Sequence, residues 1–215
     1  MIKKVIILIG LPGSGKGTQG AIISKELAIP HISTGDIFRA MIKEGSKEAK
    51  LLTEYIEDGK LIPSDLVNKI VRKYILSEEC KDGCILDGYP RTLDQAEYFI
   101  ENITSDVATI FLDLDDETAT KRILGRISCS KCGAIYNEFY DKPIIEGECD
   151  HCHSKAFSAR SDDDENIIKS RLEAYKKETL PMLDFYKKKG RFFVVDASRD
   201  KQEIIKEVSE IVKKI

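Results

Sequence analysis

Short runs of apolar, often β-branched residues alternate along the chain with longer stretches whose apolar residues recur at helical spacing. The runs at 5–9, 84–86, 107–114 and 192–195 predict strands, and the stretches at about 17–27, 64–75, 94–102, 116–124, 165–188 and 200–214 predict helices. Alternating strands and helices are typical of an α/β fold, in which helices cover both faces of a parallel sheet. The carboxyl ends of the strands then meet along one edge, where ligands bind.

Two stretches interrupt this alternation. Residues 33–62 have the pattern of short helices rather than of a strand, and residues 126–163 combine cysteines and glycines with short alternating pieces such as Ala134-Ile135-Tyr136. We therefore predict two insertions at the ligand edge, a good arrangement for segments that move. The core would then consist of residues 1–32, 63–125 and 164–215.

A glycine-rich segment links the first predicted strand to the first predicted helix. It reads Gly10-Leu11-Pro12-Gly13-Ser14-Gly15-Lys16-Gly17-Thr18 and contains the spacing Gly-x-x-x-x-Gly-Lys. Glycines allow successive backbone N–H groups to converge on one anion, the helix adds its positive dipole end, and Lys16 adds a full charge. The segment therefore predicts a phosphate-binding loop. Its hydroxyl residue stands at Thr18, one place later than in the generic motif.

A second segment, Leu86-Asp87-Gly88-Tyr89-Pro90-Arg91-Thr92, follows another predicted strand. Asp87 could orient the water shell of Mg²⁺, and Arg91 could bind a phosphate through two hydrogen bonds. Asp-Gly is also a common turn, and an arginine is more often a solvated surface residue. The segment gains weight as a phosphate site only together with the glycine-rich loop.

Arginines occur at predicted non-helical or hinge positions, whereas most lysines follow solvent-facing helical patterns. The planar guanidinium group matches phosphate geometry, so this distribution indicates phosphate contacts, with surface ion pairs as the alternative. The arginines in question are Arg39, Arg91, Arg122, Arg126, Arg160 and Arg171.

The six cysteines form two groups. Cys80 and Cys84 lie near an apolar run and are expected to be reduced, packed thiols. The others, Cys129, Cys132, Cys149 and Cys152, form two Cys-x₂-Cys pairs separated by 16 residues, a spacing typical of structural Zn²⁺ sites. Four thiolates would complete the shell, so we expect His151 and His153 to be surface residues. Disulfides are the alternative.

Composition limits the function further. The 215 residues are 42% hydrophobic and 33% charged, as in an ordinary globular protein, and carry a net charge of −3. This charge disfavours a general nucleic-acid binder. The start Met1-Ile2-Lys3-Lys4 resembles the head of a signal peptide, but its five-residue apolar run is too short for one and predicts a buried strand. We expect an intracellular, cytoplasmic protein that does not span a membrane.

These motifs, in this order, resemble the adenylate kinases of the long, zinc-lid type. Besides the loop, the matching pieces are Ile-Ser-Thr-Gly-Asp at 32–36 with Arg39, Gly-Lys-Leu-Ile-Pro at 59–63, the Asp87 segment with Gln95, Arg-Ile-Leu-Gly-Arg at 122–126, both cysteine pairs, Arg160-Ser161-Asp162-Asp163 and Arg171-Leu172. The resemblance implies a P-loop NTPase-type core with a five-stranded parallel sheet, an AMP-binding insertion at 33–62 and a zinc-binding lid at 126–163. It also implies a monomer that catalyses MgATP + AMP ⇌ 2 ADP in adenine nucleotide homeostasis.

The resemblance also implies roles for individual residues. ATP would contact Gly13, Ser14, Gly15, Lys16, Gly17, Thr18, Arg122, Arg126, Ile135, Tyr136 and Arg199. AMP would contact Thr34, Arg39, Lys60, Leu61, Ile62, Gly88, Tyr89, Pro90, Arg91, Gln95, Arg160 and Arg171, with Thr34 and Gln95 at the adenine end. Catalysis would rest on Lys16, Asp87, Arg91, Arg122, Arg126, Arg160 and Arg171, and the lid hinge on Asp162 and Asp163.

The chain departs from the family pattern at a few positions. Tyr89 stands where phenylalanine is more frequent, Ile127 replaces a second lid arginine, and His153 and Ala197 replace usual glycines. Ala197 lies close in the sequence to Arg199, which the resemblance places at the adenine end of ATP.

Two other functions fit part of the sequence. A sibling kinase acting on UMP, CMP or GMP would share the loop and most arginines, but Thr34 and Gln95 favour AMP. A binding module could use the cysteine knuckle on nucleic acid. However, the knuckle carries only Lys131 and Lys142 as basic residues, beside Glu138, Asp141, Glu146, Glu148 and Asp150, and would repel a phosphate backbone.

Overall fold

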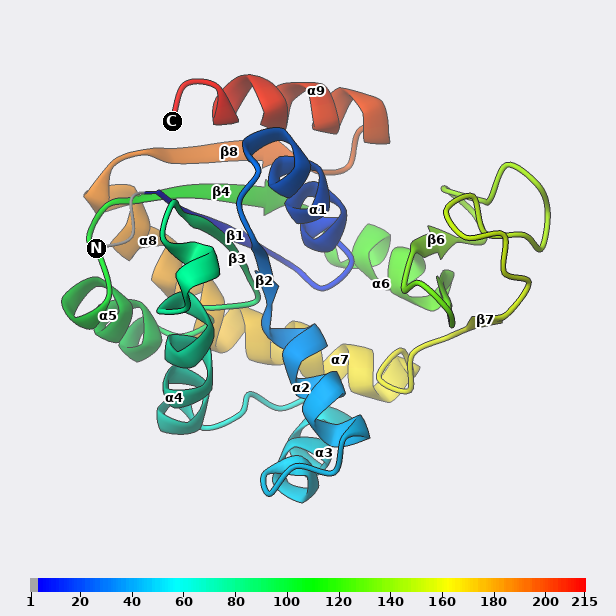
Figure 1. Cartoon of the computed structure of the whole chain (residues 1–215), viewed down its shortest axis with the longest axis horizontal. Coiled ribbons are helices and arrows are strands. Elements are labelled where there is room, and N and C mark those ends of the chain that lie inside the picture. The colour runs from blue at the N-terminus through cyan, green and yellow to red at the C-terminus, as the bar shows by residue number, and fades with distance from the viewer. Residues whose placement is uncertain (1–3) are drawn as a thin grey trace.

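The computed structural model describes residues 4–215, so the start of the chain at Met1–Lys3 lies outside the described residues. Its central sheet has five parallel strands in the order β2-β3-β1-β4-β8 (Figure 1). The strands are β1 Val5–Gly10, β2 His31–Ser33, β3 Cys84–Asp87, β4 Val107–Asp113 and β8 Phe192–Asp196. Because Leu8 of β1 pairs with Asp87 of β3, the end of β3 lies beside the strand that leads into the glycine-rich loop.

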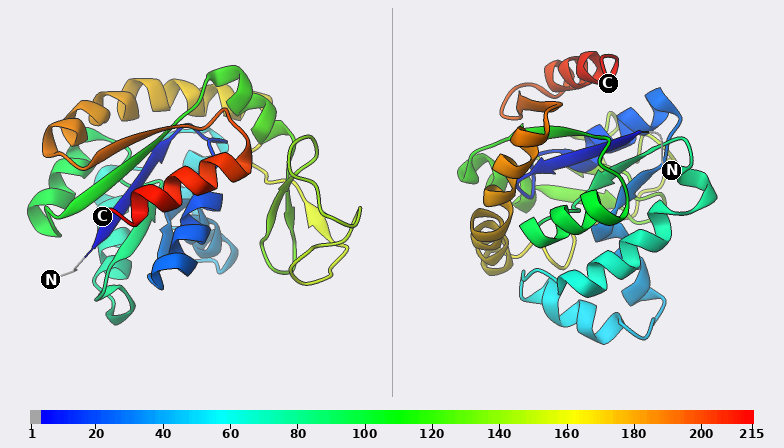
Figure 2. Two further views of the ribbon diagram at one scale, coloured as in Figure 1. Left: turned by 90° about the horizontal axis from the view of Figure 1, so that it is seen from above. Right: turned by 90° about the vertical axis from the view of Figure 1, so that its left-hand side faces the viewer.

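Helices cover both faces of this sheet, as the sequence predicts (Figure 2). Alternate side chains of β1 point to opposite faces. Val5, Ile7 and Ile9 pack into a core with α4 Ser64–Ile75, α5 Leu93–Asn102 and α8 Leu180–Lys189. Ile6 and Leu8 pack into a second core with α1 Lys16–Leu27, α6 Asp116–Leu124, α7 Glu165–Ala174 and α9 Lys201–Val212. The near-continuous apolar run of β1 is therefore buried from both sides.

The two stretches that break the alternation have structures of their own. Residues 33–62 contain α2 Thr34–Lys43 and α3 Ala49–Glu57, which confirms short helices there. Residues 126–163 contain a small antiparallel sheet in the order β6-β5-β7, made of β5 Arg126–Cys129, β6 Ile135–Asn137 and β7 Phe157–Ser158. This sheet projects from the rest of the molecule on the side of α6 (Figures 1 and 2).

Three sequence predictions need correction. Strand β2 has no counterpart among the predicted strands, because it is three residues long with Ile32 as its single apolar residue. The helix predicted at 165–188 consists of α7 and α8 joined by a π-helical turn, Tyr175–Thr179. Arg39, Arg122 and Arg171 lie within the helices α2, α6 and α7. The prediction that the arginines of this set occupy non-helical or hinge positions is therefore wrong for these three as regards non-helical positions.

Two smaller predictions can be compared directly with the structure. Cys80, in the short 3₁₀ helix Glu78–Cys80, and Cys84 are buried and free, as expected. Within residues 4–215, no helix combines the length and apolarity needed to cross a membrane.

Candidate active site

The glycine-rich loop after β1 adopts a conformation that requires its glycines. Gly13 and Gly15 have φ values of +84° and +90°, which side chains other than glycine rarely adopt. A β-carbon on Gly13 would also lie 2.8 Å from the carbonyl oxygen of Ala119. Lys16, the first residue of α1, donates hydrogen bonds from Nζ to the carbonyl oxygens of Gly10 and Leu11, each at 2.8 Å. Its ammonium group is therefore held over the loop that the sequence assigns to phosphate.

Lys16 and Asp87 influence each other electrostatically across the end of the sheet. Burial lowers the pKa of Lys16 from 10.5 to about 8, although the nearby Asp87 carboxylate opposes this shift. Burial would raise the pKa of Asp87, but His31, Lys16 and Arg91 together hold it below its ordinary value. The pair thus offers a cation and an ionised carboxylate at the carboxyl ends of β1 and β3.

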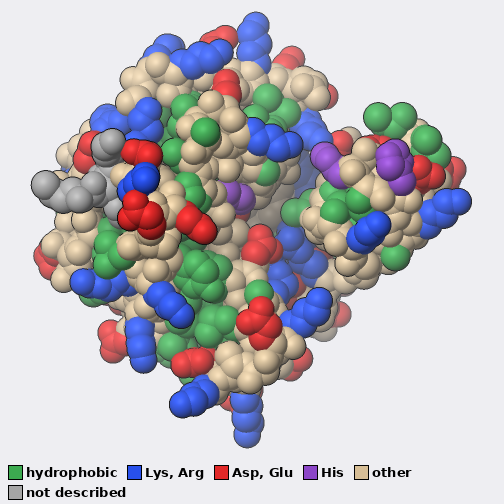
Figure 3. Space-filling model, viewed as in Figure 1, with side chains coloured by type: hydrophobic (Ala, Val, Ile, Leu, Met, Phe, Trp, Pro, Cys, Tyr) green, Lys and Arg blue, Asp and Glu red, His purple; other side chains and the backbone are tan. Residues whose placement is uncertain are grey.

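A cavity of about 640 Å³ opens at this edge of the sheet. Among the predicted residues, those that line it are Gly13, Ser14, Gly15, Lys16, Gly17, Thr18, Arg39, Leu61, Asp87, Gly88, Pro90, Arg91, Arg122, Arg126, Ile135, Tyr136, Arg160, Arg171 and Arg199. Figure 3 shows basic side chains in the hollow between the main body and the projecting small sheet. One cavity therefore collects residues from both insertions and from the core.

A second cavity, of about 80 Å³, shares Arg39, Leu61, Gly88, Arg91 and Arg171 with the first. Lys60, Ile62, Gln95 and Asp162 also line it. The Oε1 atom of Gln95 accepts a hydrogen bond from the backbone N–H of Arg91 at 2.9 Å. The predicted AMP residues thus surround a small recess that continues from the main cavity.

Thr34 and Tyr89 line neither of these two cavities. The Thr34 hydroxyl is buried and donates to the carbonyl oxygen of Gly88 at 2.8 Å. The Tyr89 hydroxyl is likewise buried and donates to Oδ1 of Asn68 at 2.8 Å. Both hydroxyl groups therefore donate to other protein groups, and their direct contacts with a nucleotide stay a prediction.

The arginines that line the cavity are oriented by hydrogen bonds to the protein. Arg91 donates from Nε to the Gly88 carbonyl at 2.8 Å, and Arg122 donates from Nη1 to the Ala197 carbonyl at 2.7 Å. Arg171 donates from Nη1 to the backbone and carboxylate oxygens of Asp162, both at 3.0 Å. These contacts fix the guanidinium groups while leaving several of their N–H donors free for a ligand.

Positive charge is crowded in this cavity. Burial and the neighbouring Arg126 lower the pKa of both Arg160 and Arg171 to about 10, although Asp162 opposes the shift in each case. An anionic ligand would relieve the mutual repulsion of these groups. The cavity is therefore electrostatically suited to a polyphosphate.

Sequence reasoning missed two contacts that organise the site. Thr179, in the π-helical turn, donates from Oγ1 to the carbonyl oxygen of Arg91 at 2.8 Å, and Nε2 of His31 lies 3.5 Å from Oδ2 of Asp87. Each contact joins residues more than fifty positions apart in the chain, so no local motif signals it.

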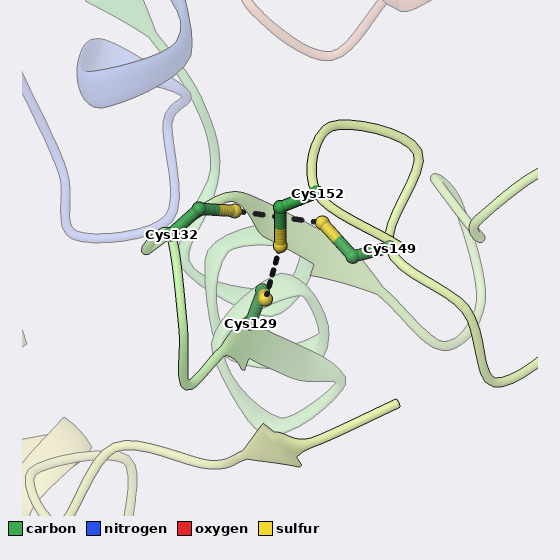
Figure 4. Close-up of side chains that lie close together, drawn as sticks. All are labelled: Cys129, Cys132, Cys149 and Cys152. Carbon is green, nitrogen blue, oxygen red and sulfur yellow. Dashed lines mark hydrogen bonds between the residues drawn. The ribbon is translucent and has the colours of Figure 1, made fainter. Parts of the chain in front are cut away.

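The side chains of Cys129, Cys132, Cys149 and Cys152 converge on one point (Figure 4). Their Sγ atoms all lie within 4.8 Å of one another, and the Cys129–Cys152 and Cys132–Cys149 pairs are each 3.5 Å apart. A disulfide needs about 2.05 Å, whereas four thiolates at about 2.3 Å around one tetrahedral ion lie about 3.8 Å apart. The cluster therefore fits a metal ion better than disulfides.

The backbone around the two cysteine pairs is also alike. Gly133 donates from its N–H to the Cys129 carbonyl, and His153 donates to the Cys149 carbonyl, each at 2.9 Å. Gly133 and His153 have φ values of +74° and +56°. The His151 and His153 side chains are exposed, as predicted, and the group of described residues whose ligand atoms converge here consists of the four cysteines.

Comparison with known proteins agrees with this geometry. A family model described as Adenylate kinase matches residues 8–191. Adenylate kinases of Rickettsia africae (strain ESF-5) and Rickettsia typhi (strain ATCC VR-144 / Wilmington) are each 46% identical to this chain, over 209 and 210 residues. The adenylate kinase of Rickettsia akari (strain Hartford) is 44% identical over 209 residues. Each alignment covers 97% of this chain and 99% of the relative. The chain therefore belongs to the adenylate kinase family.

Proposed function

We propose that the arginine-lined cavity is the place where this chain, an ATP:AMP phosphotransferase of the adenylate kinase family, transfers the terminal phosphoryl group of MgATP reversibly to AMP. The observation that carries this assignment of the site is the convergence of the glycine-rich loop and the arginines on that one cavity. Phosphoryl transfer needs little covalent assistance from the protein, so positioning and neutralisation of charge supply most of the catalysis.

The ATP phosphates would bind to the loop from Gly13 to Thr18. Its backbone N–H groups and the start of α1 favour anions, and Lys16 would move from the loop carbonyls to the outer phosphates. Arg122 and Arg126 would contact the same phosphates from α6 and β5, with Ile135, Tyr136 and Arg199 nearer the rest of ATP.

AMP would occupy the recess beside Arg91. Arg39 and Arg171, which line both cavities, and Arg160, which lines the main one, would hold its phosphate. Gln95 and the backbone of Lys60–Ile62 would contact the nucleoside. Thr34 would contribute through the Gly88 loop that it supports. Asp162 and Asp163 would act at the lid hinge, because they bind Arg171 and Arg126 on either side of it.

Mg²⁺ would enter with ATP and be held through Asp87. The ionised Asp87 carboxylate beside Gly17 is the type of ligand that Mg²⁺ accepts, directly or through water. The ion supplies neutralisation of phosphate charge. The protein residues bind and orient the phosphates, and no side chain is required as a general base.

Transfer to water is the competing reaction, so the site must exclude water before the chemical step. We therefore propose that residues 33–62 and 126–163 move as an AMP-binding segment and a lid on a core made of 1–32, 63–125 and 164–215. Lid opening would then limit turnover. The enzyme would act as a cytoplasmic monomer on ATP, AMP and ADP.

We also propose that the four-cysteine cluster holds a structural Zn²⁺. Four protein thiolates leave no coordination position for substrate, so the ion would stabilise a lid with a small apolar core. One zinc ion per chain, measured by elemental analysis of the purified protein, is the expected result. Removal of zinc should lower the melting temperature more than the low-temperature activity, and an equally heat-stable metal-free form would contradict this role.

One assay tests the reaction and its acceptor. The protein is mixed with MgATP and, separately, with AMP, UMP, CMP or GMP, and diphosphate formation is followed. ADP should form fastest with AMP. Preference for another nucleotide would keep the phosphate site but overturn the roles of Thr34 and Gln95, and no transfer to any acceptor would overturn the proposed function.

A further inference from the structure

Tyr136 of β6 contacts the cysteine cluster directly. Its hydroxyl oxygen lies 3.4 Å from Sγ of Cys149 and accepts a hydrogen bond from the backbone N–H of Asp150 at 2.8 Å. Since the oxygen already accepts from that N–H, the hydroxyl proton is available to the cysteine sulfur. The ring is 6% exposed and packs edge-on against Phe157. Tyr136 therefore has one fixed orientation, with its hydroxyl directed at a metal-ligand sulfur.

The preceding residue of the same strand faces the nucleotide cavity. Ile135 Cδ1 lies 4.0 Å from the position of a β-carbon built on Gly17 of the phosphate loop. Successive side chains of a strand point to opposite faces. Strand β6 thus connects the two sites: Ile135 lies over the phosphate loop, and Tyr136, which also lines the cavity, directs its hydroxyl at the cysteine cluster.

Strand β5 makes the same connection beside it. Arg126 begins β5 and lines the cavity, and Cys129, which ends β5, belongs to the cluster. The two strands pair with Ile127 opposite Tyr136 and Arg126 opposite Asn137. A rearrangement at either end of this hairpin would therefore be transmitted to the other end through paired backbone.

We propose that Tyr136 is a positioning residue that couples occupancy of the cysteine cluster by metal to nucleotide binding in the cavity. This inference rests on the zinc site and the ATP site proposed above. A hydrogen bond to a ligand atom orients that ligand, and its loss typically costs about 10- to 100-fold in metal affinity. Coupling between two binding sites is reciprocal, so nucleotide and zinc would each tighten the binding of the other by the same factor.

The experiment measures the zinc dissociation constant of the full chain by competition with a zinc-selective chromogenic chelator. It is done with and without a non-hydrolysable ATP analogue and Mg²⁺. In the unaltered protein the analogue should lower the constant about fivefold or more, the usual lower bound for coupled sites. This arm needs no variant, so it stays informative even where a substitution prevents folding.

Tyr136→Phe removes only the hydroxyl group. It should raise the zinc dissociation constant about tenfold. The ratio of the constants measured without and with the analogue should then fall close to one. Tyr74→Phe is the control, because it makes the same change at a tyrosine of α4 that is 42% exposed and lines neither cavity. It should keep both the zinc affinity and the effect of the analogue.

The failures of the separate proposals are distinguishable. A chain that retains zinc while Tyr136→Phe leaves both quantities unchanged would overturn the role of Tyr136 alone. Zinc binding that does not respond to the analogue in the unaltered protein would overturn the coupling. A chain that binds no zinc would overturn the metal site and, with it, this inference, but it would leave the phosphotransferase assay unaffected.

Discussion

Arg126 and Asp163 form a two-point ion pair that joins the first residue of the lid sheet to the segment returning to the core. Arg126 Nε donates to Oδ2 of Asp163 at 2.8 Å, and Nη2 donates to Oδ1. The two side chains are 13% and 4% exposed. Oδ1 of Asp163 also lies 3.6 Å from Nη1 of Arg171, so the same carboxylate contacts the helix that follows the lid. The Asp163 carboxylate therefore links the start of segment 126–163, at Arg126, to the helix that follows its end, at Arg171.

Replacing Asp163 by asparagine should destabilise the protein strongly. The neutral amide would leave Arg126 buried without its counter-charge, and breaking a buried pair in this way costs about 3 kcal/mol or more. Urea denaturation at pH 7 measures the loss. Glu117→Gln, which breaks the exposed pair between Glu117 and Lys121, is the control and should cost less than about 0.5 kcal/mol. Equal losses in the two variants would show that the Arg126–Asp163 pair does not fasten the lid.

The charge state of Lys16 should make the affinity for ATP and kcat/KM depend on pH. Burial lowers its pKa to about 8, so the ammonium form that attracts phosphates is complete below that pH and is lost as the pH rises through it. The affinity for ATP and kcat/KM, which reports the free enzyme, should therefore fall above about pH 8. Bound phosphates stabilise the charged form, so kcat should persist to higher pH.

Lys16→Met tests this assignment. The variant should lose turnover by orders of magnitude while keeping its fold, and its residual ATP affinity should lack the step near pH 8. Binding titrations between pH 6.5 and 9.5, with circular dichroism as the check on folding, provide the measurement. If Lys16→Met kept the same step, another group would be responsible for it.

The elements that were predicted correctly carry their signal locally. β1, β3, β4 and β8 are apolar runs bounded by polar residues, and the loop before α1 is a contiguous motif. β2 lacked such a signal, since three residues with one apolar position are too few for a pattern. Its existence depends on pairing with β3, through Ile32 opposite Leu86, and this pairing is a tertiary contact.

The site was predictable to a similar extent. Loop, arginine and cysteine positions could be read as motifs, and the cavity collects most of them. The contacts that orient these residues could not be predicted from the sequence. Asp163 contacts Arg126, and Tyr136 contacts Cys149, only after residues 126–163 have folded. Thr34 shows that a motif position can also mislead about ligand contact. Its hydroxyl donates to the Gly88 carbonyl, and the residue lines neither cavity.

Thr179 should affect the AMP side of the reaction more than the ATP side. Its hydroxyl donates to the Arg91 carbonyl, so Thr179→Val would leave that buried carbonyl without this donor and let the Arg91 loop shift. A hydrogen bond of this kind contributes about 0.5–1.5 kcal/mol, which corresponds to a loss of about two- to thirteenfold in kcat/KM for AMP. The KM for ATP should stay nearly constant. Thr179→Ser keeps the donor and should restore the activity; an equal loss in both variants would exclude the hydrogen bond as the cause.

His153 should be replaceable by glycine with a gain in stability. It occupies the left-handed backbone region, at φ +56°, in the position that Gly133 fills in the first cysteine pair. A side chain costs about 1 kcal/mol or more there, and glycine adopts that region freely. The pair that His153 makes with Glu148 would be lost, but the histidine side chain is 77% exposed and such pairs contribute little. Thermal denaturation should therefore show a higher melting temperature for His153→Gly. His151→Gly, two positions earlier and without a positive φ, should lower it through added freedom of the unfolded chain. If both glycines lowered the melting temperature equally, backbone strain at His153 would not be limiting the stability of the lid.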